Sequence, residues 1–143
     1  MIKQRKIARH TIINEETPAF FFLGVVSSEP DYRLSVMMNR HLGTDLRKCP
    51  EDIITSTTTG NHLFTRFVSG AHGLSLVSNR SEGSMLIHKL QNIDFLLVIS
   101  GQHDRKKAEE MVNSVREISE VTAVFLFDSR KISDRNLTLL AAL

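Results

Sequence analysis

The chain has 143 residues, of which 41% are hydrophobic and 24% charged, and it contains a single cysteine. A chain of this length buries about two thirds of its unfolded surface in one core, and its apolar content excludes a chain that is disordered for lack of hydrophobic groups. The lone Cys49 excludes an intramolecular disulfide and favours a cytoplasmic setting, and no apolar stretch approaches the ~20 residues that span a bilayer.

Positive charge is concentrated at the start of the chain. Subtracting the four basic residues of the first nine positions from the 18 Lys and Arg leaves 14, against 16 Asp and Glu. We therefore divide the chain into a basic N-terminal arm, residues 1–15, and a single slightly acidic domain, residues 16–143. Cations of this kind bind phosphates, so the candidate contacts to nucleic acid are Lys3, Arg5, Lys6 and Arg9.

The first predicted elements are a strand and a helix. Residues 19–28, AFFFLGVVSS, form a nearly unbroken apolar run that is typical of a strand covered on both faces. Ser28 and Asp31 resemble a capping box, and Pro30 suits a first helical turn. Apolar residues then recur every three or four positions up to a glycine, which predicts an amphipathic helix over residues 31–43.

The middle of the chain predicts an antiparallel meander. Residues 62–70 and 74–79 are strand-like and flank the turn-forming Gly-Ala-His-Gly at 70–73, and Arg-Ser-Glu-Gly at 80–83 predicts a further turn. The Thr-rich stretch 53–59 is a weaker candidate for an edge strand. Polar and apolar residues interleave here, so we expect these to be the outer strands of a sheet.

A strand, a helix and another strand follow. Residues 93–100 and 121–128 are apolar strands, and between them residues 105–118 carry one apolar stripe that predicts a helix, with Asp104 as its N-cap. The final segment, residues 135–143, is apolar enough to dock either as a short helix or as an edge strand.

The order of these elements predicts the fold class. It is α+β: a mostly antiparallel sheet with two helices on one face, in a ferredoxin-like or split βαβ arrangement with extra strands. The three most apolar segments, residues 19–28, 93–100 and 121–128, are expected side by side in the middle of that sheet. Because two helices cover only one face, the other is expected to need cover, which a protein partner or a second copy of the chain supplies.

One group of side chains suggests a ligand cleft. If the strand over residues 19–28 lies parallel to the strand over 93–100 and next to it, the ends of both strands meet beside two helix N-termini, where open sheets bind ligands. The candidate residues of this cleft are Ser27, Ser28, Gln102, His103, Asp104 and Asp128. Each residue also has a structural reason to be present, as a cap or a turn former.

The sequence contains no complete catalytic, metal or nucleotide-binding signature. The six histidines lack ligand spacing and Cys49 has no second cysteine to share a metal, so we assign no metal, no cofactor and no catalytic residue. Asp94 stands at the start of a buried strand, where it is either a general base or a polar residue at the rim of the strand. Binding is therefore expected rather than catalysis.

The function that this composition favours is a small cytoplasmic binding or adaptor domain that acts through protein–protein contacts and self-associates. One alternative is an RNA- or ribosome-associated protein that uses the basic arm. A second alternative is a small enzyme that uses the cleft at the strand ends.

Residues 87–95, IHKLQNIDF, resemble the motif of the IPExxxVDY family, an uncharacterised family of Bacteroidetes proteins. Ile87 and Asp94 match the motif. Isoleucine and phenylalanine replace its valine and tyrosine conservatively, whereas His88 and Lys89 stand where it has proline and glutamate. Because Lys89 stands in place of that glutamate, the resemblance transfers no catalytic role for it to this chain.

Three further stretches extend the resemblance over most of the chain. They are Asp31-Tyr32-Arg33-Leu34 and Asn39 on the first predicted helix, and Asn79-Arg80 at the second turn. The resemblance implies a shared fold as readily as a shared activity. An ion pair between Arg33 and a carboxylate such as Asp94 is one structural role that it implies.

Overall fold

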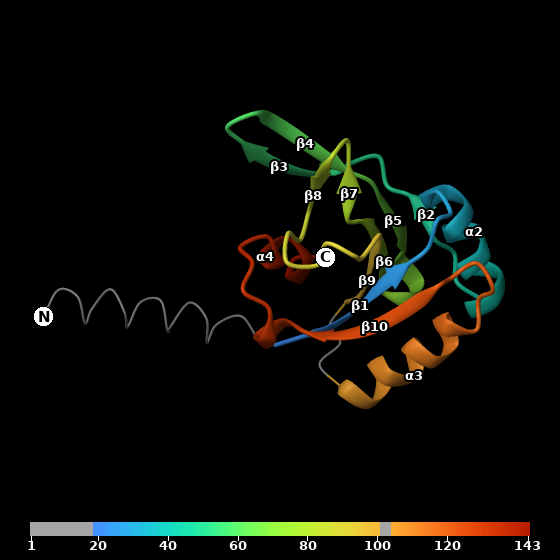
Figure 1. Cartoon of the computed structure of the whole chain (residues 1–143). Helices are drawn as coiled ribbons and strands as arrows, with labels where there is room; N and C mark the ends of the chain where they lie inside the picture. Colours follow the sequence, from blue (N-terminus) through green and yellow to red (C-terminus); the bar gives the residue numbers. More distant parts are fainter. Residues whose placement is uncertain (1–18, 101–103) are drawn as a thin grey trace, which may run out of the picture.

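The computed structural model describes residues 19–100 and 104–143, and its main feature is a six-stranded sheet (Figure 1). The strands of this sheet are β1 (Phe21–Val26), β2 (Arg47–Lys48), β5 (Arg66–Ser69), β6 (Leu74–Ser78), β9 (Phe95–Ile99) and β10 (Ala123–Asp128). Their order is β10-β1-β9-β6-β5-β2, and every neighbouring pair is antiparallel.

Two split βαβ units build the centre of this sheet. In the first, α2 (Asp31–Leu42) follows β1 and precedes β6, and β9 lies between the two strands. In the second, α3 (Arg105–Arg116) connects β9 to β10, and β1 lies between them. The predicted α+β class with a split βαβ arrangement is confirmed; the extra strands are inserted between α2 and β6 and between β6 and β9.

The three most apolar strands lie side by side, as predicted, but they are not all central. β1 and β9 are internal, whereas β10 forms one edge of the sheet. β10 also alternates in burial, since Val124 is buried and Phe125 is 49% exposed. An apolar run predicts a strand but does not say how many of its sides are paired.

One face of the sheet packs against α2 and α3 (Figure 1). The helices contribute apolar residues at helical spacing, Leu34 and Met38 from α2 and Val112 and Val115 from α3. The strand residues that face this side of the sheet, including Leu23, Leu76 and Leu97, pack against these helix residues. Each fully buried Leu stabilises the fold by roughly 1.5–3 kcal/mol, so this layer holds both helices to the sheet.

The opposite face is covered by the chain itself, which corrects the expectation of an exposed sheet face. A short C-terminal helix, α4 (Leu137–Ala141), places Leu137 and Leu140 in a second core. The segment that precedes β9 adds Leu86 and Ile87, both fully buried. The choice between helix and strand for the C-terminal segment is therefore resolved as a helix.

Two small hairpins lie outside the main sheet. They are β3 (Ile53–Thr57) with β4 (Gly60–Phe64), and β7 (Arg80–Ser81) with β8 (Ser84–Met85). The predicted strand over residues 62–70 is in fact two strands, because the chain breaks at Thr65 and changes sheets. The predicted turn at 70–73 contains a 3-10 turn, η1 (Gly70–His72), and a second one, η2 (Ser129–Lys131), follows β10.

The helix termini agree with the sequence except at one cap. Asp104 caps α3, because its carboxylate accepts a hydrogen bond from Lys106 N at 2.9 Å. α2 begins at Asp31 as predicted, but its N-cap is Pro30 and no side chain caps it, so the predicted capping box with Ser28 is wrong. In the described part of the chain, no helix has the length and apolarity to cross a membrane.

Candidate functional site

The predicted cleft at the strand ends does not form. β1 and β9 are antiparallel, so Ser27 and Ser28 follow β1 at the end of the sheet where β9 begins. Asp128 lies opposite Phe21 at the other end of β1, and Asp104 caps the helix that follows β9. In a split βαβ unit the inserted strand runs against both of its neighbours, and a continuous apolar run cannot reveal that direction.

Several predicted site residues lie outside the described residues. They are Gln102 and His103 of the cleft, and the candidate nucleic-acid contacts Lys3, Arg5, Lys6 and Arg9.

Asp94 holds a strand junction together. Its Oδ2 accepts a hydrogen bond from Ser27 N at 3.0 Å, and its Oδ1 accepts one from Arg80 Nε at 2.8 Å. Arg80 also donates to the Gln91 carbonyl. Both carboxylate oxygens of Asp94 are therefore used in structural hydrogen bonds, as expected for a polar residue at the rim of a strand. Arg33 is not its partner, because Arg33 pairs with Glu29 at 3.6 Å along α2 and its preceding turn.

Asn79 is the polar centre of the second core. Its side chain is fully buried, donates to the Leu90 and Ile93 carbonyls, and accepts a hydrogen bond from Ile87 N at 2.8 Å. These bonds fold the irregular segment 86–93 against the sheet. The Ile87–Asp94 stretch that carries the family resemblance is therefore shaped by Asn79 and Arg80.

Asp128 lies at a basic corner of the fold. Arg130 donates to both of its carboxylate oxygens, at 3.1 and 2.8 Å. A hollow of about 280 Å³ beside it is also lined by Arg105 and Lys131, and the Arg105 guanidinium lies 5.9 Å from the centre of the Phe21 ring. The side-chain hydrogen bond from Arg130 holds the pKa of Asp128 below its usual 3.8, although burial opposes that shift.

This lowered pKa predicts a pH-dependent stability. A carboxyl group whose pKa is lower in the folded than in the unfolded chain stabilises the fold when ionised, so the contribution is present above pH 3.8 and lost as the pH falls through the folded value. Asp128→Asn is thus expected to destabilise the protein at about pH 6, and the difference from the wild type should shrink well below pH 3.8. Urea unfolding at both pH values measures this difference.

Asp45→Asn is the control. It removes an exposed pair with Arg47 and should have little effect on stability. An equal effect of Asp128→Asn at both pH values would contradict the lowered pKa of Asp128.

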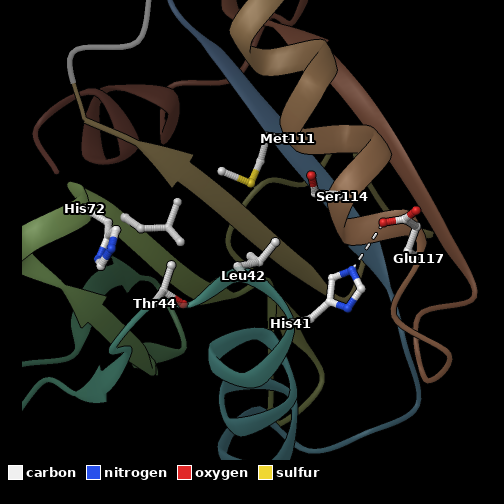
Figure 2. Close-up of a pocket in the computed structure, with 8 residues that line it drawn as sticks. His41, Leu42, Thr44, His72, Met111, Ser114 and Glu117 are labelled. Carbon is white, nitrogen blue, oxygen red and sulfur yellow. Dashed lines mark hydrogen bonds and ion pairs between the residues drawn. The ribbon is translucent and has the colours of Figure 1, made fainter.

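The larger hollow lies between the C-terminal ends of α2 and α3 and has a volume of about 570 Å³ (Figure 2). Its apolar lining comes from Leu42, Leu74 and Met111, and its polar lining from His41, Thr44, His72, Ser114 and Glu117. Figure 2 shows His41 at the end of α2 reaching towards Glu117 at the end of α3, with His41 Nε2 at 3.4 Å from Glu117 Oε1. This volume is in the range of small-molecule sites.

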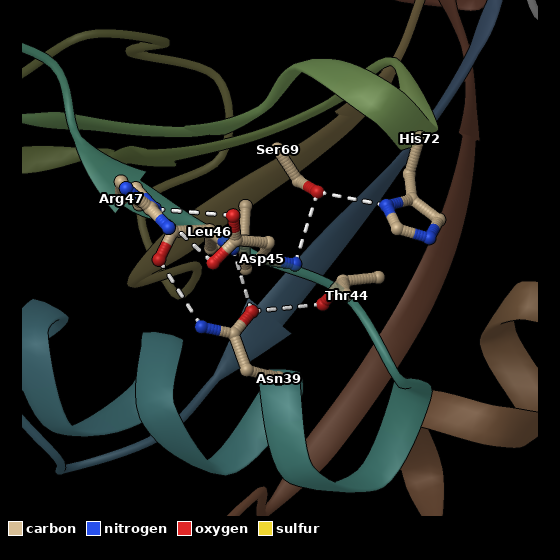
Figure 3. A network of polar contacts seen from close by, with 7 residues as sticks. All are labelled: Asn39, Thr44, Asp45, Leu46, Arg47, Ser69 and His72. Carbon is tan, nitrogen blue, oxygen red and sulfur yellow. Dashed lines mark hydrogen bonds and ion pairs between the residues drawn. The ribbon is translucent and has the colours of Figure 1, made fainter.

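A polar network fixes the rim of this hollow (Figure 3). Asn39 of α2 holds the loop that follows the helix: its Oδ1 accepts from Leu46 N at 2.7 Å and from Thr44 Oγ1 at 2.9 Å, and its Nδ2 donates to the Leu46 carbonyl. The rim is therefore held by a helix side chain rather than left to a free loop.

Ser69 holds the other side of the rim. Its buried Oγ accepts a hydrogen bond from Asp45 N at 3.0 Å and lies 2.9 Å from His72 Nδ1. His41 and His72 are both exposed at this rim, and no spacing in the sequence links the four segments that meet here. Within the described ranges, no group of three or more His, Cys, Asp or Glu side chains is placed to hold a metal ion.

The outer edge of β10 is a second candidate site. Ser129 N donates to the Phe20 carbonyl at 3.0 Å, and residues that face a neighbour alternate along an antiparallel ladder. Val124 and Leu126 therefore direct their backbone N–H and C=O groups away from β1. The Val124 carbonyl accepts a 3.4 Å hydrogen bond from Arg116 of α3.

Comparisons with known proteins found no match: no family model, no curated protein and no solved structure matches the chain.

Proposed function

We propose that the chain is a protein-binding domain that self-associates by pairing the β10 strands of two copies into one continuous sheet. The observation that carries the proposal is the β10 edge, a six-residue strand whose sequence, AVFLFD, contains no proline and no basic residue. Natural edge strands are usually protected by charges, prolines or bulges, because an unprotected edge pairs with other strands. Partner binding by strand addition uses such edges.

A two-fold axis perpendicular to the sheet determines how two β10 strands can pair. Such an axis makes the contact isologous, with the same residues on both copies. With Phe125 beside the axis, Val124 of one copy exchanges hydrogen bonds with Leu126 of the other. The Val124 carbonyl, which also accepts the 3.4 Å bond from Arg116, uses its second lone pair for this contact. Phe125 then faces its own counterpart in a non-hydrogen-bonded pair, where side chains lie closest and an aromatic pair contributes roughly 0.2–1 kcal/mol.

The charges that flank β10 suit this antiparallel register. Exposed Glu120 precedes the strand and exposed Arg130 follows it, at the same distance in sequence from Phe125. In this register the end of one β10, which the Asp128-bound Arg130 follows, lies beside the start of the other, which Glu120 precedes, and this arrangement occurs twice. Opposite charges at both ends favour this register over parallel pairing, which would bring like charges together.

Oligomeric state tests the proposal directly. The wild-type protein is expected to be a dimer by sedimentation or light scattering, and Phe125→Lys is expected to be a monomer, because a lysine beside the axis faces a second lysine. Leu63→Lys is the matched control. Leu63 is 51% exposed on the β3–β4 hairpin, against 49% for Phe125, so this variant should remain dimeric. A monomeric wild type, or equal behaviour of the two variants, would refute the proposal.

A cross-link tests the register. In a Cys49→Ser background, Phe125→Cys should form an intermolecular disulfide, because residues opposite each other in a non-hydrogen-bonded pair have Cα atoms about 4.5 Å apart, within the range for a disulfide. Ala123→Cys in the same background serves as the control, since in this register Ala123 of the second copy lies four residues further along the partner strand. Equal cross-linking at both positions would indicate non-specific association.

The family resemblance supports binding rather than catalysis. The residues that carry it make structural hydrogen bonds: Asn39 holds the loop after α2, Asn79 holds the segment before β9, and Asp94 pairs with Arg80. If the chain belongs to the IPExxxVDY family, the shared residues specify the fold. For Asn39, Asn79 and Asp94 these hydrogen bonds give a structural reason to be present.

A further inference from the structure

We propose that the hollow between the ends of α2 and α3 binds an organic cation, an ammonium or guanidinium group on an apolar stem. The proposal does not rest on self-association, because the lining of the hollow includes no residue of β10.

The apolar stem is favoured by the lining. Leu42 of α2, Leu74 at the start of β6 and Met111 of α3 supply apolar surface from three elements. Pockets that bind small molecules combine such surface with a few convergent polar groups. The hollow is thus large enough for an alkyl chain of several carbons.

The hydroxyl groups at the rim can only accept hydrogen bonds from a ligand. Ser114 Oγ donates its hydrogen to the Glu110 carbonyl at 3.2 Å, and Thr44 Oγ1 donates its hydrogen to Asn39 Oδ1 at 2.9 Å. A hydroxyl has one hydrogen and two lone pairs. Both hydroxyls therefore have only lone pairs left, which suits a ligand that is rich in N–H groups.

Glu117 supplies a negative charge that is still accessible. Its side chain is 72% exposed, and its contact with His41 measures 3.4 Å, longer than the 2.7–2.9 Å of a strong charge-assisted hydrogen bond. An ammonium ion can therefore compete with His41 for this carboxylate (Figure 2).

Both helices present their C-terminal ends to the hollow. α2 ends at Leu42 and α3 has Glu117 as its C-cap. The end of a helix carries a partial negative charge, equivalent to about half an elementary charge, and it attracts cations. Two such ends at one hollow favour a positive ligand over a negative one.

His72 adds a polar ring to the rim of the hollow. Its Nδ1 lies 2.9 Å from the buried Ser69 Oγ, which also accepts a hydrogen bond from Asp45 N. Either Ser69 Oγ or His72 Nδ1 can be the donor in this contact, which holds the ring at the rim.

Calorimetric titration of the full chain with matched probes tests the ligand class. The probes are n-butylammonium, butyrate and n-butanol, together with a lysine residue blocked at both its amino and carboxyl ends. Saturable binding of a cationic probe, with butyrate and butanol weaker by at least about tenfold, is the expected result. Binding of n-butylammonium alone would indicate a free amine, and binding of the blocked lysine alone would indicate a side chain of a partner protein; either supports the proposal.

Two substitutions on the exposed rim separate this role from a structural one. Glu117→Gln is expected to weaken binding about tenfold, because it removes the negative charge. His41→Asn is expected to strengthen binding a few-fold, because it removes the competitor for Glu117. If the His41–Glu117 pair only maintained the shape of the hollow, both variants would bind the ligand more weakly. Glu110→Gln, on the same helix but outside the lining, is the control and should bind as the wild type does.

Three results would overturn the proposal. They are no saturable binding of either cationic probe, butyrate binding as tightly as n-butylammonium, and unchanged affinity in Glu117→Gln.

Discussion

Asn79→Ala is expected to lower the free energy of unfolding by about 3–5 kcal/mol. The substitution leaves two carbonyls and one N–H without the partner that Asn79 provides, and each buried polar group without a partner costs about 1–3 kcal/mol. The segment 86–93 contributes Leu86 and Ile87 to the second core, so loosening it also exposes apolar surface. Urea unfolding followed by circular dichroism measures the change.

Asn61→Ala is the matched control for Asn79→Ala. Asn61 is exposed on the β3–β4 hairpin, where its Oδ1 accepts a hydrogen bond from Ser56 Oγ, and its loss should change stability by less than about 0.5 kcal/mol. Hydrogen exchange gives a local readout, since the Ile87 amide should exchange faster in Asn79→Ala. If the two variants were equally stable, the segment 86–93 would not depend on Asn79.

Gly24→Ala is expected to destabilise the protein by about 1–3 kcal/mol through overpacking. A Cβ at Gly24 would overlap Cε2 of Phe127 and would lie 3.0 Å from Cδ1 of Ile93. The half-buried Phe127 ring packs against Phe22 with ring centres 5.5 Å apart. The ring must turn outwards to admit the methyl group, and this contact is then lost.

The control for Gly24→Ala is another glycine with open space around it. A Cβ at Gly70 would meet no heavy atom within 4 Å, and Gly70 needs no left-handed backbone, so Gly70→Ala should be neutral or stabilise by about 0.4–1 kcal/mol. Thermal unfolding of both variants measures the difference. A Gly24→Ala variant as stable as Gly70→Ala would mean that Phe127 moves at no cost.

The sheet and its two long helices could be predicted because their signals are local. Apolar runs identify β1 and β9, and apolar residues at helical spacing identify α2 and α3. The cover of the second face could not be predicted in the same way. It depends on contacts such as Asn136 Nδ2 to the Leu86 carbonyl, which join irregular segments far apart in the chain and leave no periodic pattern.

The candidate sites were harder to predict than the fold. The cleft failed because strand direction decides which ends meet, and an apolar run contains no information on direction. The hollow between α2 and α3 is lined from four segments, so no local motif connects His41 with His72 and Glu117. β10 is an edge strand because only β1 pairs with it, and the apolar sequence of the strand does not indicate this.

The position of β1 at the heart of the sheet has a consequence for folding during synthesis. β1 is synthesised before its partner strands, because Phe22 pairs with Val98 and Phe21 with Asp128. The nascent strand can therefore pair only after most of the described chain has left the ribosome. Contacts so distant in sequence give a high contact order, which slows folding. Until β9 and β10 emerge, the aromatic residues of β1 remain without partners and present a natural target for chaperones.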